Sequence, residues 1–130
     1  FGFQLRVACP HGYAPPNELL AWARANGGDI ILTEDVAEAV DQVQTVVTDV
    51  WVSMGQEGGS QQQDLLAYQV NEDVMNHAAS DAIFMHCLPA KRGLEVSVAV
   101  IDGPQSVVFD EAENRLHAQK AILAWCFAGK

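Results

Sequence analysis

Three short clusters in this sequence combine side chains that can bind or activate a small polar molecule: residues 49–55 (DVWVSMG), 86–89 (HCLP) and 113–115 (ENR). The carboxylate of Asp49 can hold an ammonium group, and Ser53 with the backbone of Met54 can bind the polar end of an amino acid. Cys87 supplies a thiol or thiolate, and the planar cation of Arg115 suits an oxyanion or a polarised carbonyl. Together these groups describe a site for a small zwitterion and an anionic partner.

Each of these residues also has a simpler interpretation. Asp49 can serve only as a turn former or a helix cap, and a lone cysteine such as Cys87 is usually a small buried apolar residue. Arg115 can pair with Glu111 or Glu113 on the surface of a helix. Taken singly, these residues therefore do not distinguish a functional site from ordinary structure.

The cysteines and histidines do not have the spacing of a zinc site. Three cysteines spread over the chain are an odd number and a poor disulfide framework, which indicates a reducing compartment such as the cytoplasm: Cys9, Cys87 and Cys126. Because neighbouring side chains of a strand point to opposite faces, His86 and Cys87 should not act together. We therefore expect no metal site, and we interpret His86 as a buried core histidine.

The elements that must position the clusters can be read from the hydrophobic pattern. Strands are predicted at residues 4–8, 29–33, 44–49, 82–86 and 106–109. Helices are predicted at residues 16–25, 35–41 and 71–78, and a final helix is predicted from residue 110 onward. The polar, glycine-rich stretch that starts at residue 53 predicts a long mobile loop.

The final helix has the clearest signals. Asp110 and Glu113 have the spacing of a capping box, which places the start of the helix at residue 110. One face of this helix is apolar and includes Leu116, Leu123 and Phe127. This helix is therefore the best-defined element that the sequence predicts.

Strands that alternate with helices predict an α/β fold, Rossmann-like, with a mainly parallel sheet covered by helices on both faces. Such sheets bind ligands at the carboxyl ends of their strands, and the three clusters follow the third, fourth and fifth predicted strands. We therefore expect Asp49, Cys87 and Arg115 to converge. A nearby arginine favours the thiolate, so Cys87 should be the most reactive of the three cysteines.

Composition excludes several classes of partner. The 130 residues carry 17 acidic and 7 basic side chains, a net charge of −10, and 49% of the residues are hydrophobic. The hydrophobic fraction is sufficient for the core of one globular domain. The excess of acidic residues leaves no broad basic face that could bind nucleic acid. No apolar run approaches the roughly 18 residues that span a bilayer, so we expect no membrane insertion.

The clusters lie within three longer strings, residues 48–57 (TDVWVSMGQE), 84–89 (FMHCLP) and 108–115 (VFDEAENR). These strings closely resemble the ornithine carbamoyltransferase family in sequence, order and approximate spacing, and the resemblance extends over nearly the whole chain. It implies a two-domain transferase whose carboxy-terminal domain binds ornithine. The aspartate-specific relatives resemble this chain less, because they use cationic side chains where it has Asp49.

The resemblance also implies roles for individual residues. Three residues belong to an ornithine-binding motif whose loop closes over the amino acid after carbamoyl phosphate has bound: Asp49, Ser53 and Met54. Cys87 and Leu88 would lie between the two substrates, with backbone carbonyls that accept the carbamoyl NH2 group and a thiol near the attacking amine. Arg115 would contact carbamoyl phosphate.

The implied reaction transfers the carbamoyl group to the δ-amine of L-ornithine and gives L-citrulline and phosphate, a step of arginine metabolism and amino-acid biosynthesis. It needs no metal and no organic cofactor. The resemblance further implies a homotrimer, or a multiple of trimers, in the cytoplasm.

The family's carbamoyl-phosphate domain has no counterpart in residues 1–130, nor has the strand that begins its ornithine-binding domain. We therefore interpret the chain as a partial ornithine-binding domain, inactive alone, that needs the missing amino-terminal domain as a partner. The alternative is a non-catalytic α/β module that binds an amino acid or another protein. A cysteine hydrolase that uses Cys87 ranks last, because no base is positioned beside the thiol.

Overall fold

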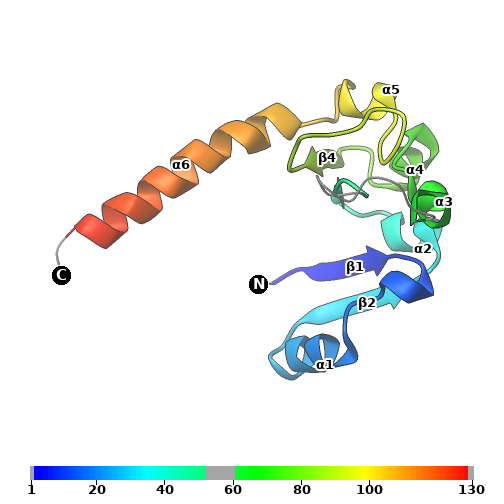
Figure 1. Ribbon diagram of the computed structural model, residues 1–130, viewed down its shortest axis with the longest axis horizontal. Helices are drawn as coiled ribbons and strands as arrows, with labels where there is room; N and C mark the ends of the chain where they lie inside the picture. Colours follow the sequence, from blue (N-terminus) through cyan, green and yellow to red (C-terminus); the bar gives the residue numbers. More distant parts are fainter. Residues whose placement is uncertain (1, 52–60, 129–130) are drawn as a thin grey trace.

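A computed structural model of the chain describes residues 2–51 and 61–128 as an α/β arrangement of short elements (Figure 1). These are β1 (Gln4–Ala8), η1 (His11–Tyr13), α1 (Asn17–Ala25), β2 (Asp29–Thr33), α2 (Val36–Val40), β3 (Thr45–Thr48), α3 (Gln61–Leu65), η2 (Leu66–Tyr68), α4 (Glu72–His77), β4 (Ile83–His86), α5 (Val98–Ile101) and α6 (Val108–Phe127). The first four predicted strands and the helices between them are confirmed. The predicted loop is wrong over residues 61–68, which form α3 and η2.

Local side-chain chemistry explains where the first two helices begin and end. Gly27 adopts a positive φ of 80°, and the amide of Gly28 donates to the carbonyl of Ala23 at 2.8 Å, which closes the end of α1. The carboxylate of Asp35 accepts hydrogen bonds from the amides of Ala37 and Glu38 and so caps α2. α1 connects β1 to β2, and α2 connects β2 to β3, the first of the two strands that carry the expected site.

The strands form parallel pairs, as the alternating pattern predicts. β1 pairs with β2, and β3 pairs with β4 so that Thr48 lies opposite His86 at the carboxyl ends. Over the described residues the pairs form two separate two-stranded sheets instead of one continuous sheet, because no ladder joins β1 to β3. The resemblance places a further strand beside β1, and that expectation stays a prediction.

The predicted fifth strand is wrong. Ser106 makes only an isolated parallel bridge to Phe84. The amide of Phe84 donates to the carbonyl of Gln105, and the amide of Val107 donates to the carbonyl of Phe84. The chain then turns directly into α6, which begins at Val108. The predicted capping box is also wrong, because Asp110 lies inside the first turn and no side chain caps this helix. Two β-branched residues at the start of the helix, Val107 and Val108, therefore resembled a strand in the sequence.

The core surrounds β4. Phe84 is fully buried, and the residues packed with it come from β3, α4, α5 and the start of α6. The buried cluster contains Val40, Val46, Val70, Met75, Ala78, Ala82, Phe84, Val96, Val100, Ile101 and Val108. This packing holds the carboxyl ends of β3 and β4 in place, which is where the polar clusters lie.

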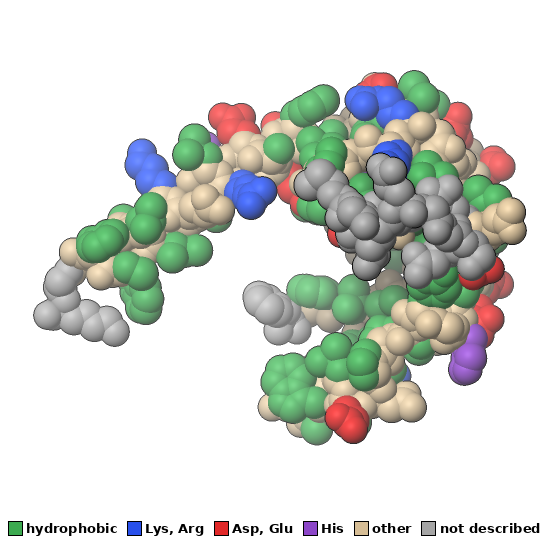
Figure 2. Space-filling model, in the orientation of Figure 1, with side chains coloured by type: hydrophobic (Ala, Val, Ile, Leu, Met, Phe, Trp, Pro, Cys, Tyr) green, Lys and Arg blue, Asp and Glu red, His purple; other side chains and the backbone are tan. Residues whose placement is uncertain are grey.

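Helix α6 extends away from this core after its first turn (Figure 1). Val108 is its one buried residue among those described, and the apolar side chains of its second half are exposed (Figure 2). The apolar face that the sequence predicts for this helix is solvent-exposed: Leu116 is 65%, Leu123 56% and Phe127 83% exposed. No described helix, the 20-residue α6 included, is both long enough and apolar enough to cross a membrane.

Candidate functional site

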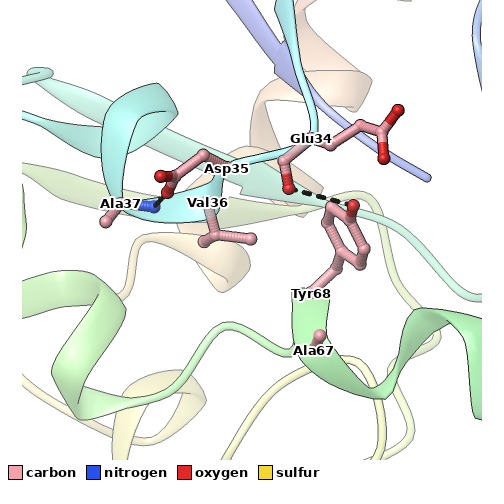
Figure 3. Close-up of a pocket in the computed structure, with 6 residues that line it drawn as sticks. All are labelled: Glu34, Asp35, Val36, Ala37, Ala67 and Tyr68. Carbon is pink, nitrogen blue, oxygen red and sulfur yellow. Dashed lines mark hydrogen bonds between the residues drawn. The ribbon is translucent and has the colours of Figure 1, made fainter. Parts of the chain in front are cut away.

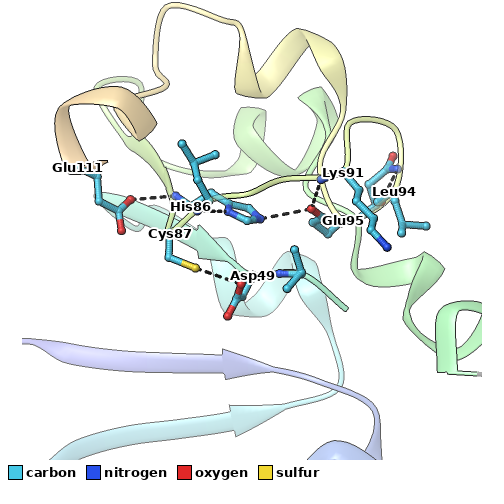
Figure 4. A network of polar contacts seen from close by, with 10 residues as sticks. Asp49, His86, Cys87, Lys91, Leu94, Glu95 and Glu111 are labelled. Atoms are coloured by element: carbon cyan, nitrogen blue, oxygen red, sulfur yellow. Dashed lines mark hydrogen bonds and ion pairs between the residues drawn. The ribbon is translucent and has the colours of Figure 1, made fainter. Parts of the chain in front are cut away.

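The pairing of β3 with β4 brings the first two clusters together. Asp49 and Cys87 each follow one residue of the Thr48–His86 pair, and their side chains meet. The thiol of Cys87 donates a hydrogen bond to Oδ1 of Asp49 at 3.1 Å (Figure 4). Both side chains are exposed, so a small molecule can reach the pair.

Asp49 has one oxygen available for a ligand. Its Oδ1 accepts from the thiol and also from the amide of Val50 at 2.7 Å. Its Oδ2 makes no hydrogen bond with any residue in the described ranges. A carboxylate held through one oxygen and open at the other suits a cationic ligand such as an ammonium group.

The charges near Cys87 differ from those expected. The hydrogen bond to Asp49 raises the pKa of the Cys87 thiol, and partial burial and the negative charges of Asp49 and Glu111 raise it further. The expectation that Arg115 favours the thiolate is therefore wrong, because the charged groups that act on the sulfur are carboxylates. At neutral pH Cys87 is a protonated thiol that donates to Asp49.

This environment predicts a low reactivity at Cys87. Because only the thiolate is alkylated, iodoacetamide at about pH 8 should label Cys87 more slowly than the exposed Cys126. The substitution Asp49→Asn removes the negative charge and should move the labelling profile of Cys87 to lower pH. Timed alkylation with peptide mapping measures both effects, and fastest labelling at Cys87 with no response to Asp49→Asn would contradict them.

His86 lies on the other side of the turn, buried as the sequence predicts. Its Nδ1 accepts a hydrogen bond from the amide of Leu88 at 2.9 Å, so the proton of the neutral ring is on Nε2. Nε2 lies 3.3 Å from Oε1 of the fully buried Glu95, without the alignment of a hydrogen bond (Figure 4). The imidazole therefore supports the turn, and it makes no contact with the thiol that would form the dyad of a cysteine hydrolase.

Leu88 occupies a tight turn that this contact supports. It has a positive φ of 54° and precedes Pro89 through a cis peptide bond. Glu95 accepts a hydrogen bond from the backbone amide of Lys91, so both ends of the turn are tied to the His86–Glu95 pair. Sequence reasoning missed Glu95. The available signal was a glutamate between the apolar residues Leu94 and Val96.

Arg115 does not contact the Asp49–Cys87 pair. It is exposed on α6, with no hydrogen bond or ion pair to any residue within 2–51 or 61–128. The expected pairing with Glu111 or Glu113 is also absent there: Glu113 lies 4.0 Å from His117, and Glu111 accepts a hydrogen bond from the amide of His86 at 3.0 Å. Ser53 and Met54, the remaining predicted site residues, lie outside the described residues.

A group of three potential metal ligands occurs at the same place. Asp49, His86 and Cys87 each offer one ligand atom, and these atoms lie within 4.8 Å of one another. Nδ1 of the imidazole already accepts the Leu88 amide, and Nε2 faces the carboxylate of Glu95 at 3.3 Å. We therefore assign the cluster to contacts among its own side chains, and no step below uses a metal.

An open pocket over the described residues lies elsewhere. It has a volume of about 530 Å³ and is lined by Glu34, Asp35, Val36, Ala37, Ala67 and Tyr68 (Figure 3). Two of its polar groups already have partners: the hydroxyl of Tyr68 donates to the carbonyl of Glu34 at 3.0 Å, and Asp35 caps α2. None of the predicted site residues lines this pocket, so it does not change the assignment.

Comparison with known proteins shows that almost the whole chain matches a known binding domain. The family described as "Aspartate/ornithine carbamoyltransferase, Asp/Orn binding domain" matches residues 1–126. An ornithine carbamoyltransferase of Mesorhizobium japonicum is 58% identical over 127 residues, which are 97% of this chain and 42% of that protein. The chain thus spans less than half the length of this curated relative.

Solved structures give the same result. An ornithine carbamoyltransferase from Pyrococcus furiosus superposes with a TM-score of 0.86 at 48% identity, covering 95% of this chain and 41% of that one. An acetylornithine transcarbamylase complexed with acetylcitrulline has a TM-score of 0.79 at 30% identity, covering 95% and 40%. By sequence and by fold, this chain belongs to the aspartate/ornithine carbamoyltransferase family and corresponds to its Asp/Orn binding domain.

Proposed function

We propose that this chain supplies the ornithine-binding portion of an enzyme that transfers a carbamoyl group from carbamoyl phosphate to the δ-amine of L-ornithine. The observation that carries the proposal is the contact between Asp49 and Cys87 at the paired ends of β3 and β4. It forms an exposed acidic site at the edge of the sheet where α/β proteins bind ligands. The identity of 58% to an ornithine carbamoyltransferase supports ornithine as the amino acid.

In this reaction the δ-nitrogen forms a bond to the carbamoyl carbon, the bond from that carbon to the phosphate oxygen breaks, and one proton leaves the nitrogen. The amine must be neutral to attack, although a free alkyl ammonium has a pKa of about 10.4. The open Oδ2 of Asp49 would bind and orient the cationic amino acid. Cys87 would contact the amine as a neutral thiol, since its own raised pKa leaves it protonated.

The remaining predicted residues complete the proposal. Ser53 and Met54 would bind the amino acid with Asp49, and the backbone carbonyls of Cys87 and Leu88 would accept the carbamoyl NH2 group. Arg115 would stabilise the negative charge that develops on the carbonyl oxygen and phosphate. We therefore assign catalytic contacts to Cys87 and Arg115, and substrate binding to all six residues.

A second candidate is a module that binds an amino acid without catalysis. The specific observation in its favour is length, because the chain spans 42% of the Mesorhizobium relative. Titration of the chain with ornithine, followed by carbamoyl phosphate and a separately prepared carbamoyl-phosphate domain, separates the two. Citrulline formation supports the transferase, whereas ornithine binding without citrulline supports the module.

The substitution Asp49→Asn tests the site itself. With the carbamoyl-phosphate domain present, loss of the charge-assisted contact should reduce kcat/KM for ornithine by about 10- to 100-fold and leave the KM for carbamoyl phosphate nearly unchanged. Asp81→Asn is the matched control, because Asp81 is exposed before β4 and makes no polar contact in the described part of the chain. Steady-state kinetics with both substrates varied would remove Asp49 from the site if ornithine kinetics did not change.

We further propose that the enzyme is a homotrimer, or a multiple of trimers, in the cytoplasm, and that it acts in arginine metabolism. The resemblance to the family supports the trimer. The free state of Cys9, Cys87 and Cys126 supports a reducing compartment. Sedimentation of the chain together with the carbamoyl-phosphate domain measures the oligomeric state.

A further inference from the structure

A side-chain hydrogen bond links the first turn of α6 to the end of β4. Oε2 of Glu111 accepts a hydrogen bond from the backbone amide of His86 at 3.0 Å (Figure 4). Val108 packs in the core three residues earlier. Beyond Glu111 the described residues of α6 are exposed, so Glu111 is the last residue of this helix that is held against the β3–β4 sheet.

This contact reaches the backbone immediately before Cys87. The amide of His86 precedes that residue by one peptide, and the ring of the same histidine holds the amide of Leu88 on the other side. The turn that carries the thiol is therefore tied to α6 through Glu111 and to the interior through Glu95. Removing either contact releases one side of the turn.

The same contact influences the position of Arg115, which lies further along α6. Arg115 follows Glu111 by four residues, and residues with this spacing lie on one face of a helix, one turn apart. Arg115 has no other polar contact within the described ranges to fix its position relative to Cys87. The distance between the two thus depends on how the first turn of α6 is attached.

We propose that Glu111 is a positioning residue, whose hydrogen bond to the His86 amide sets the placement of Arg115 on α6 relative to the turn that carries Cys87. This assignment rests on the proposed function, because it needs Arg115 and Cys87 to act on one pair of substrates. Glu111 also adds negative charge near the thiol. Among the described residues, the other charge that acts on the thiol is that of Asp49, which follows β3. Its charge and its hydrogen bond can be separated experimentally.

Two variants make this separation. Glu111→Gln keeps an oxygen that accepts the amide and removes the charge, whereas Glu111→Ala removes both. Glu113→Ala is the matched control, because Glu113 is an exposed acid of the same helix that does not contact His86. Amide hydrogen exchange of His86 reports the contact, and the buried Ile101, whose amide donates to a backbone carbonyl, reports global unfolding.

In the full chain, Glu111→Ala should speed exchange at His86 roughly tenfold or more without a matching change at Ile101. With the carbamoyl-phosphate domain present, the same variant should lower kcat about tenfold or more, with little change in the KM for ornithine. Glu111→Gln should stay within about threefold of the parent in both measurements and should shift Cys87 alkylation to lower pH. Glu113→Ala should match the parent throughout.

Unchanged exchange at His86 in Glu111→Ala would overturn the contact. Faster exchange with unchanged kcat would overturn the positioning role and leave the proposed function intact. A parent protein that forms no citrulline with the carbamoyl-phosphate domain would overturn the proposed function, and with it the assignment of Glu111 to this reaction. Because hydrogen exchange is measured without substrate, it tests the Glu111 contact independently of the proposed function. Failure of the one can therefore be distinguished from failure of the other.

Discussion

The 130-residue chain alone should form no citrulline above the uncatalysed background. A dianionic phosphate needs several fixed donors, and the whole sequence contains seven Lys and Arg residues. Three of these are occupied, since Arg6 and Arg24 donate to backbone carbonyls and Arg92 pairs with Asp102. Arg115 is the one predicted phosphate contact, and it is exposed on α6 without a second cation bound beside it in the described chain.

A citrulline assay with and without a separately prepared carbamoyl-phosphate domain measures this effect. Added domain should raise citrulline formation from background to a rate that saturates with both substrates. The Asp49→Asn variant with the same domain is the control, because it should bind that domain and remain impaired in ornithine use. Saturable citrulline formation by the chain alone would show that its own cations suffice.

A second large effect is expected in stability. Glu95→Ala should lower the free energy of unfolding by about 2–4 kcal/mol, because it removes a buried acceptor of a hydrogen bond and leaves a cavity in its place. Glu95 and His86 are both fully buried, and Glu95 also accepts the amide of Lys91. The truncation therefore leaves the part-buried amide of Lys91 without its acceptor and removes the carboxylate that Nε2 of His86 faces.

Urea unfolding at constant m-value measures this loss as a shift in the midpoint. Glu95→Gln keeps one acceptor oxygen and should lose less than Glu95→Ala. Glu113→Ala removes an exposed glutamate and should change the free energy of unfolding by no more than about 0.5 kcal/mol. A loss below about 1 kcal/mol in Glu95→Ala would show that the buried pair contributes little to stability.

The sequence predicted the elements whose limits depend on local chemistry. β1 and β2 were placed correctly by their hydrophobic pattern, and the end of α1 by Gly27 and Gly28. The segment around Ser106 was predicted wrongly. A short β-branched run does not show whether one of its residues or all four will pair with a neighbouring strand. That outcome depends on the packing of Val108 into the core.

The candidate site shows the same division. The positions of Asp49 and Cys87 at neighbouring strand ends follow from the alternation of strands and helices, and the structure joins them. The partner of Asp49 and the charge around the thiol do not follow from sequence, because they depend on which side chains face the sulfur. Glu95 and Glu111 were missed as supports for a similar reason: each acts across a turn or between elements.

The projection of α6 also gives the helix the geometry of a lever. Its 20 residues, at about 1.5 Å each, make an arm of roughly 30 Å whose first turn is attached to the core. A rotation of about 10° at the first turn displaces the far end by roughly 5 Å. In the opposite direction, any surface that covers Leu123 and Phe127 and fixes them to within 1 Å confines the first turn to a rotation of only about 2°. Burial of the carboxyl-terminal end of α6 would thus orient its first turn, about five helical turns away.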